Sequence, residues 1–145
     1  MSGFSTYLDD KIIDHVFKGT AFSTPTKYLA LFTSNAGLDT NTSSTWSKNE
    51  LPSSAGSYAR LALPNTIWTA ADSGATSNSS ELAYSVATSY WGNVTHIGIM
   101  DAVTGGNVLA WGALANPVTL EEEGRNIETG DQLIVRTNAL TVKLA

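Results

Sequence analysis

The N-terminal segment carries apolar residues at spacings of three and four positions, which places them on one face of a helix. Thr6 and Asp9 fit a capping box at the start of this helix, and Gly19 supplies a stop at its end. The pattern predicts one amphipathic α-helix over residues 6–18. Five apolar residues make up its face: Leu8, Ile12, Ile13, Val16 and Phe17.

After Gly19 the apolar period changes to two, which is typical of β-strands. Residues 27–34 place apolar side chains on both faces, so we expect a strand that is buried on both sides. The apolar runs 94–103 and 108–114 flank Gly105 and Gly106, which predicts a hairpin. Further short strands are expected at 58–63, 67–69, 81–87, 118–120, 132–137 and 140–144.

These segments predict a mainly β protein, an antiparallel β-sandwich or barrel of about seven to nine short strands with one N-terminal α-helix. Residues 35–57 are rich in Ser, Thr, Asn and Gly, and we expect a long loop there that is functional or mobile. Residues 121–131 are expected to form a charged connection. We find no internal repeat or linker, so residues 1–145 are expected to form a single domain.

Composition narrows the classes of function. The 145 residues include no cysteine, which excludes thiolate catalysis and zinc–thiolate or iron–sulfur sites. The 8 basic and 13 acidic residues give a net charge of −5, and the basic ones are scattered, so we expect no nucleic-acid partner. Charged residues make up 14% of the chain, against about 25% in typical proteins. Such a weakly charged, polar surface favours a structural or binding module.

The chain also lacks sequence signals for membranes or export. Residues 1–6 carry no basic flank or apolar run of a signal peptide. No apolar stretch approaches the length of about 20 residues that spans a bilayer. We therefore expect a soluble protein, made in the cytoplasm of its producer and without a membrane partner.

Candidate catalytic groups are few. His96 and Asp101 lie on one predicted strand but an odd number of residues apart, so they face opposite sides. The Gly-x-Ser-x-Gly motif of hydrolases does not occur. We therefore expect no enzymatic activity, no metal and no cofactor. For His96 a packed side chain is the first interpretation, and an interface contact is the alternative.

Two further groups of residues allow a structural and a functional interpretation. Trp91 and Trp111 each precede a glycine, which suits core packing or a contact between subunits. Glu121, Glu122 and Glu123 begin the most concentrated charge in the chain. A solvated loop is the first interpretation for these acids, and a docking patch for a basic partner is the second.

Blocks of sequence along nearly the whole chain resemble a family of small tailed-phage virion proteins. Members of this family are labelled tail-fibre proteins, and others resemble capsid cement proteins that sit as trimers over the major capsid protein. The resemblance implies no catalytic residue. The blocks are 14–20, 28–33, 56–60, 87–88, 91–99, 101–102, 104–107, 111–114, 130–133 and 140–142.

Between these two roles we expect capsid decoration. The protein would then form a homotrimer on the capsid exterior of the virion, bind and stabilise the shell of major capsid protein, and be synthesised in the host bacterial cytoplasm. The alternative is a tail-tip or tail-fibre module involved in host attachment, for which Trp46 or Trp68 would be exposed to stack on a glycan. Candidate contacts with the shell or between subunits are Phe4, Trp46, Trp91, His96, Trp111, Glu121, Glu122 and Glu123.

Overall fold

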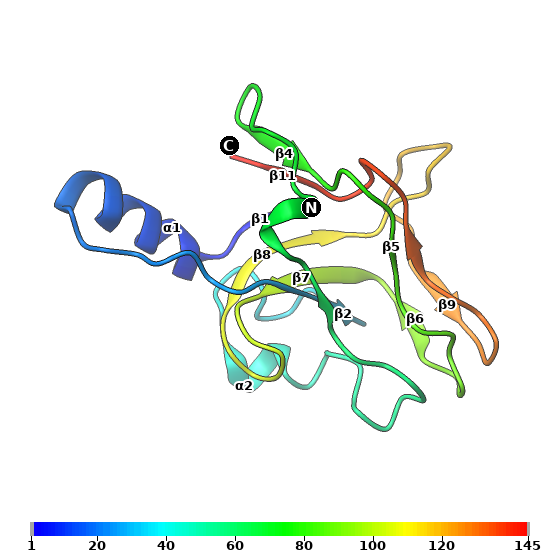
Figure 1. The fold of residues 1–145 in the computed structure, drawn as a ribbon. Coiled ribbons are helices and arrows are strands. Elements are labelled where there is room, and N and C mark those ends of the chain that lie inside the picture. The colour runs from blue at the N-terminus through cyan, green and yellow to red at the C-terminus, as the bar shows by residue number, and fades with distance from the viewer. Residues whose placement is uncertain (1, 145) are drawn as a thin grey trace.

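Antiparallel strand pairs make up most of the fold, as the alternating pattern predicts. The computed structural model describes residues 2–144, and Figure 1 shows the chain as a ribbon. The predicted mainly β class with one N-terminal helix is confirmed, with eleven short strands over residues 2–144 where seven to nine were expected. The strands are β1 Ser2–Phe4, β2 Tyr28–Phe32, β3 Leu61–Ala62, β4 Ala75–Ser77, β5 Leu82–Ala83, β6 Gly92–Val94, β7 His96–Met100, β8 Val108–Ala113, β9 Arg125–Ile127, β10 Ile134–Val135 and β11 Thr141–Lys143.

A five-stranded sheet in the order β1-β8-β7-β2-β3 forms the centre of the molecule. Its predicted hairpin is confirmed, because β7 and β8 pair antiparallel across a turn that contains Gly105 and Gly106. Both glycines have positive φ angles, 61° and 76°, which side chains disfavour. The register shifts between Ile99 and Met100, so that Leu109 is the extra residue of a bulge.

The central sheet is buried on both faces. Strand β2 shows this directly, since Ala30 and Phe32 face one cluster of core residues while Leu29 and Leu31 face another, as predicted. The first cluster is covered by the short helix α2, Ser43–Trp46. The second is covered by three separate strand pairs, β5–β10, β4–β11 and β6–β9. Figure 1 shows β5, β6 and β9 on one side of the central sheet and β4 and β11 above it.

The predicted helix over residues 6–18 is confirmed, as α1 Thr6–Ile13 continued by a π-helical turn, η1 Asp14–Lys18. Gly19 ends it with a φ of 72°, in the left-handed conformation expected at a helix stop. The start differs from the prediction, because the cap is Ser5 and not Thr6. The Ser5 hydroxyl is buried, accepts a hydrogen bond from the backbone N–H of Leu8 at 3.3 Å and donates one to the carbonyl of Val108.

Several of the weaker predictions are wrong. Residues 35–57 contain α2 and turns that bury Trp46, so this segment is not a plain loop. Residues 67–69 form no strand; the region has the 3₁₀ helix η2, Asn65–Ile67. Residues 118–120 form an exposed turn, in which Leu120 has a φ of 63°. The connection 121–131 contains strand β9, which has one buried apolar side chain, Ile127, and therefore no detectable alternation.

Candidate interaction surface

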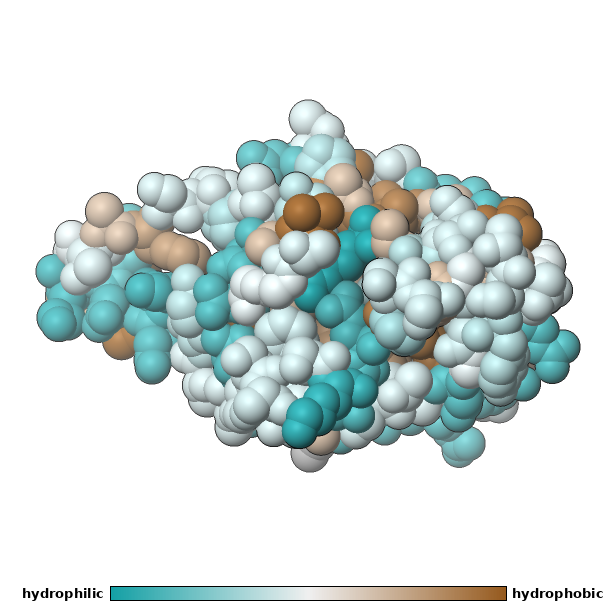
Figure 2. All heavy atoms as spheres, turned by 90° about the horizontal axis from the view of Figure 1, so that it is seen from below, coloured by the Kyte–Doolittle hydropathy of each residue, from teal (hydrophilic) through white to brown (hydrophobic). Residues whose placement is uncertain are grey.

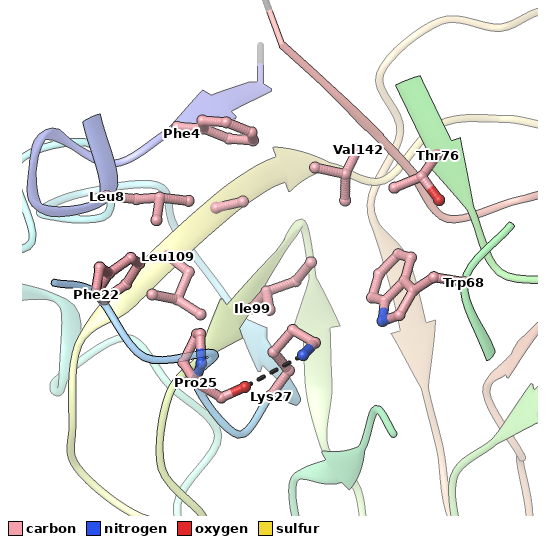
Figure 3. Close-up of a pocket in the computed structure, with 11 residues that line it drawn as sticks. Phe4, Leu8, Phe22, Pro25, Lys27, Trp68, Thr76, Ile99, Leu109 and Val142 are labelled. Atoms are coloured by element: carbon pink, nitrogen blue, oxygen red, sulfur yellow. Dashed lines mark hydrogen bonds between the residues drawn. The ribbon is translucent and has the colours of Figure 1, made fainter. Parts of the chain in front are cut away.

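An apolar groove of about 260 Å³ lies between the base of α1, the central sheet and strands β4 and β11 (Figure 3). Its walls come from segments far apart in the sequence, because the N-terminal strand, the hairpin strands β7 and β8 and the C-terminal strand meet here. Figure 3 shows their apolar side chains arranged around one hollow. The lining residues are Phe4, Leu8, Phe22, Pro25, Lys27, Trp68, Thr76, Ile99, Leu109, Ala110 and Val142. We call this set the groove.

A second hollow of about 680 Å³ adjoins the groove between β1, β8 and the C-terminal strand β11. The two hollows share Phe4, Ile99, Ala110 and Val142 in their linings, so they lie on one continuous face of the molecule. The second hollow is more polar and includes Lys143. Together they form a surface that is concave and apolar at the groove, which is a feature of interaction sites.

Lys27, Trp68 and Thr76 are the groove residues with polar side-chain atoms. The Nζ of Lys27 donates to the carbonyl of Pro25 at 3.2 Å and to Oδ1 of Asn65 at 2.6 Å, both neutral acceptors. Burial lowers the pKa of Lys27 from its ordinary value. The indole N–H of Trp68 is buried and, among the described residues, has no hydrogen-bond partner.

The helix α1 with its continuation η1 projects away from the body of the molecule (Figure 1). We call residues 6–18 the arm. None of its residues is buried, and its apolar side chains become more exposed towards the tip: Ile13 is 54% exposed, Val16 63% and Phe17 79%. Figure 2 shows apolar side chains among polar ones on the arm. The predicted apolar face therefore exists, but its outer half does not pack on the chain's own core.

The tryptophans proposed as contacts are mostly internal. Trp46 is 2% exposed and packs edge-on against Phe32 with their ring centroids 6.3 Å apart, so the prediction that it is exposed for glycan stacking is wrong. Trp91 is buried and donates its indole N–H to the carbonyl of Gly56 at 2.7 Å. Trp111 is buried in the sheet and lines the second hollow. Core packing, the first interpretation for Trp91 and Trp111, agrees with these positions.

The glycine that follows Trp111 explains how β1 joins the sheet. A Cβ on Gly112 would lie 3.2 Å from the Cβ of Ser2, which is tighter than an ordinary van der Waals contact. The missing side chain therefore lets β1 approach β8, and β1 carries Phe4 to the groove. Of the contact residues proposed from the sequence, Phe4 is the one that lines the groove.

His96 and Asp101 are not brought together. His96 is the first residue of β7 and Asp101 follows its last residue, so five residues or about 17 Å separate them along the chain. The carboxylate of Asp101 accepts hydrogen bonds from the backbone N–H and side chain of Asn107 at 2.7 and 2.9 Å, which closes the hairpin turn. The Nδ1 of His96 lies 2.8 Å from the hydroxyl of Thr95, and burial lowers the pKa of His96. His96 is half-buried beside Trp111 and does not pair with Asp101.

The acidic residues lie in an exposed turn that follows β8. The backbone N–H of Glu123 donates to the carbonyl of Leu114 at 2.9 Å, and its carboxylate accepts from Asn116 at 2.8 Å. Glu122 forms an isolated bridge with Ala115, and Glu121 is exposed. This turn is a structured surface projection, and it is separate from the lining of the groove.

A buried polar network that the sequence pattern did not predict lies behind the hairpin turn. The guanidinium of Arg60 pairs with the carboxylate of Glu50 at 2.7 Å, with 3% and 15% of their side chains exposed. The hydroxyl of Tyr58 donates to the same carboxylate at 2.9 Å. Burial lowers the pKa of Arg60, but the hydrogen bond and charge of Glu50 outweigh that effect and raise it. Within this network each charged group is paired, so removal of either partner would leave an uncompensated buried charge.

Neither a metal centre nor a membrane span is found in residues 2–144. No three His, Asp or Glu side chains there lie close enough together to hold a metal ion. Within the same described range, no helix has the length and apolar composition needed to cross a bilayer. Among the described residues, the groove and the outer half of the arm leave apolar surface uncovered.

These surfaces belong to a virion structural protein of a phage. Residues 3–143 match the family described as podophage GP4 fiber I protein gp80, and the chain belongs to this family. The phage virion family expected from the sequence resemblance is thus confirmed at this level. A comparison with curated proteins gives no match.

Proposed function

We propose that the chain is a structural module of a phage fibre, which joins other virion proteins by burying its apolar surface. The observation that carries this proposal is the family match over residues 3–143, since that family is named for a fibre protein. The groove supports it, because exposed apolar surface of this kind marks interaction sites on proteins. The exposed apolar tip of the arm supports it in the same way.

Capsid decoration, the role first expected from the sequence, is the second candidate. It is favoured by the charged fraction of 14%, since many equal copies pack on a shell with little mutual repulsion when their surfaces are weakly charged. In this role the partner would be the major capsid protein. The acidic turn would be a contact if the shell presents a basic surface to it.

Direct binding of a host glycan finds less support in the described residues. Trp46 is buried, and Trp68 is half-buried in the groove wall with its indole N–H pointing to no acceptor. A sugar site needs several convergent hydrogen-bond partners beside an aromatic ring, and the groove is lined mainly by apolar side chains. We therefore propose that any role in attachment is structural.

Separation of purified virions into heads and tails tests the two candidates. A fibre module is expected in the tail fraction at a few copies per particle when peptides are quantified by mass spectrometry. A copy number in the hundreds, confined to heads, would overturn the fibre proposal in favour of decoration. Absence from both fractions would contradict both roles.

A variant of the acidic turn sharpens the distinction. Combined Glu121→Ala, Glu122→Ala and Glu123→Ala replacement removes three exposed charges and leaves the groove intact. If the chain is a fibre module that binds through the groove, incorporation into particles is unchanged. Lower occupancy on heads would indicate a decoration protein that docks through these acids. Thr119→Ala in the same turn is the control for a purely structural disturbance.

A further inference from the structure

We propose that an extended segment of a different virion protein adds as a third strand to the free edge of β11 and lies in the second hollow. The inference rests on the proposed fibre role and deepens it, because it states by which contact the module joins its neighbour. Three features of the described residues support it: the direction of the backbone groups of β11, the open floor beside this strand and the continuity of the second hollow with the groove.

Strand β11 pairs with β4 along one edge. The N–H of Leu144 donates to the carbonyl of Gly74 at 2.8 Å, and the carbonyl of Leu140 accepts at 3.2 Å from the residue that follows β4. In an antiparallel pair, residues that exchange hydrogen bonds alternate with residues whose backbone groups point to the opposite edge. Because Leu140 and Leu144 bond towards β4, Thr141 and Lys143 direct their N–H and carbonyl groups away from it.

The outer edge of β4, by contrast, is occupied by the chain itself. The N–H of Thr69 donates to the carbonyl of Ser77 at 2.9 Å, and Asp72 and Ala75 exchange two hydrogen bonds of 3.0 Å. Within residues 2–144, no such partner is found for the outward backbone groups of β11. A strand edge with unpaired donors and acceptors is a template for another strand. The β4–β11 pair therefore offers a place for a strand beside β11.

The free edge of β11 borders the second hollow. Six consecutive residues, 139–144, line this hollow. Because successive side chains of a strand point to opposite faces, a lining by every residue indicates that the backbone edge faces the hollow. At about 3.4 Å per residue this border is about 17 Å long, which is the length of a typical strand. Another extended backbone presents donors and acceptors at this same repeat, so the edge selects an extended polypeptide as its occupant.

The floor of the second hollow is the face of the central sheet at β7 and β8. Ile97 and Gly112 lie opposite each other in the register of these strands, and both line the hollow. A Cβ on Gly112 would meet only the Cβ of Ser2 within 4 Å among the described residues, so the space above it is open. A third strand beside β11 would cover this floor. Its alternate side chains would face Ile97 or the solvent, so we expect a segment that alternates apolar and polar residues.

The groove continues the path of the added strand. Val142 lies in the middle of β11 and lines both the second hollow and the groove. Figure 3 shows Val142 and Phe4 on the same side of the groove. A strand that runs along β11 can therefore place one apolar side chain in the groove. In recognition by strand addition, main-chain hydrogen bonds give affinity, and pockets for alternate side chains give specificity.

A proline at position 141 tests the backbone contact. Proline is tolerated in an edge strand where its missing N–H would point outwards, so Thr141→Pro removes an outward donor and keeps the pairing with β4. Thr141→Ala is the matched control, because it loses the same side chain and keeps the N–H. In purified virions, we expect the amount of chain, measured by quantitative mass spectrometry, to fall at least about tenfold for Thr141→Pro and to stay unchanged for Thr141→Ala. Circular dichroism of the isolated variants verifies that both are folded.

Hydrogen exchange provides a test that depends on no substitution. The amides of Thr141 and Lys143 point outwards, so we expect them to exchange quickly in the isolated chain. In purified virions, exchange over residues 139–144 should be at least about tenfold slower, because an added strand would accept hydrogen bonds from these amides. Residues 118–120, in the exposed turn after β8, are the control and should exchange equally fast in both samples.

Three results would overturn the proposal. Equal virion content of Thr141→Pro and Thr141→Ala would show that the outward N–H is not used. Unchanged exchange of residues 139–144 in virions would show that the edge stays free. Light scattering could give twice the 15.3 kDa chain mass for the isolated chain and one chain mass for Thr141→Pro, which would assign the edge to a second copy. Each of these results leaves the fibre role standing, whereas absence of the unaltered chain from virions would contradict that role itself.

Discussion

Arg60 donates two hydrogen bonds to the carboxylate of Glu50, from Nε and from Nη2, each 2.7 Å long. The remaining Nη1 donates to the carbonyls of Ala102 and Gly105 at 2.7 and 2.8 Å. One guanidinium therefore ties the segment after α2 to the turn of the β7–β8 hairpin. Since these groups are largely buried, the pair fixes the position of the hairpin more firmly than a surface ion pair would.

Removal of Arg60 is predicted to destabilise the protein strongly. Arg60→Ala leaves the Glu50 carboxylate and two turn carbonyls without their donor, and breaking a buried pair costs about 3–5 kcal/mol. Urea unfolding followed by tryptophan fluorescence measures the change. Arg136→Ala, at an exposed arginine, is the control and should change the free energy of unfolding by less than about 0.5 kcal/mol. Equal effects of the two variants would contradict a structural role for the pair.

Asn78 is predicted to be a second determinant of stability. Its side chain is fully buried, donates to the carbonyls of Ser80 and Arg136 at 2.8 and 2.9 Å, and accepts from the N–H of Leu140 at 2.9 Å. Because it holds the chain just before β11, it also positions Val142 in the groove wall. Asn78→Ala should lower the free energy of unfolding by about 2–4 kcal/mol, since each buried partner left unpaired costs about 1–3 kcal/mol.

A matched control for Asn78 is Asn138→Ala, at an exposed position two residues before Leu140. Its φ of 65° suits asparagine, so a small loss of stability is expected there too. Hydrogen exchange should show faster exchange in β11 for Asn78→Ala than for the control. A uniform change over the whole chain would argue against a local anchor.

The raised pKa values of two buried tyrosines predict that the protein loses stability at high pH. Burial, together with the charge of Glu50, raises the pKa of Tyr58, and burial likewise raises that of Tyr84 well above its ordinary value. In the unfolded chain tyrosine titrates near about 10. The contribution of these two tyrosines to the free energy of unfolding is therefore fully present below a pH of about 10. It is lost progressively as the pH rises further, because the unfolded chain ionises first.

This prediction is measured by absorbance of tyrosinate and by unfolding at several pH values above 10. Tyr58 and Tyr84 should ionise together with unfolding and not before it. Tyr84→Phe removes the hydrogen bond to the carbonyl of Leu29, 2.6 Å long, and should make the alkaline loss of stability less steep. Tyr90→Phe, on the exposed surface, is the control. Ionisation of all five tyrosines in the folded protein would contradict the prediction.

The sequence predicted those features that a single segment encodes by its own periodicity. The helix over residues 6–18, the strand at Leu29 and the hairpin around Gly105 are of this kind. Asn78 and the pair Glu50–Arg60 escaped prediction because their partners lie elsewhere in the chain, 62 residues away for Asn78 and Leu140. Strand β9 escaped because its three residues follow no alternation and depend on pairing with β6.

In the candidate site, too, the sequence predicted the feature that one segment encodes and missed the feature that depends on distant segments. The amphipathic pattern of the arm was correct, but periodicity does not reveal whether an apolar face packs on its own chain or on another. The groove combines side chains from the N-terminus, the hairpin and the C-terminus, and no local pattern marks such a set. Trp46 was one of two tryptophans expected to be exposed if the chain bound a glycan, yet its large apolar ring packs against Phe32 in the core.

Ser5 is predicted to control how rigidly the arm is held. Its hydroxyl caps α1 through the N–H of Leu8 and also donates to the carbonyl of Val108 in β8, while its backbone N–H donates to Leu109 at 2.9 Å. Ser5→Ala removes the two side-chain bonds and leaves the apolar tip unchanged. Loss of a helix cap costs about 0.5–2 kcal/mol, so the whole fold should persist while exchange of the arm's amide protons speeds up.

Thr6→Ala, at the exposed position that the sequence suggested as the cap, should leave that exchange nearly unchanged. Faster exchange spread over the central sheet would instead indicate that Ser5 stabilises the core and not the arm.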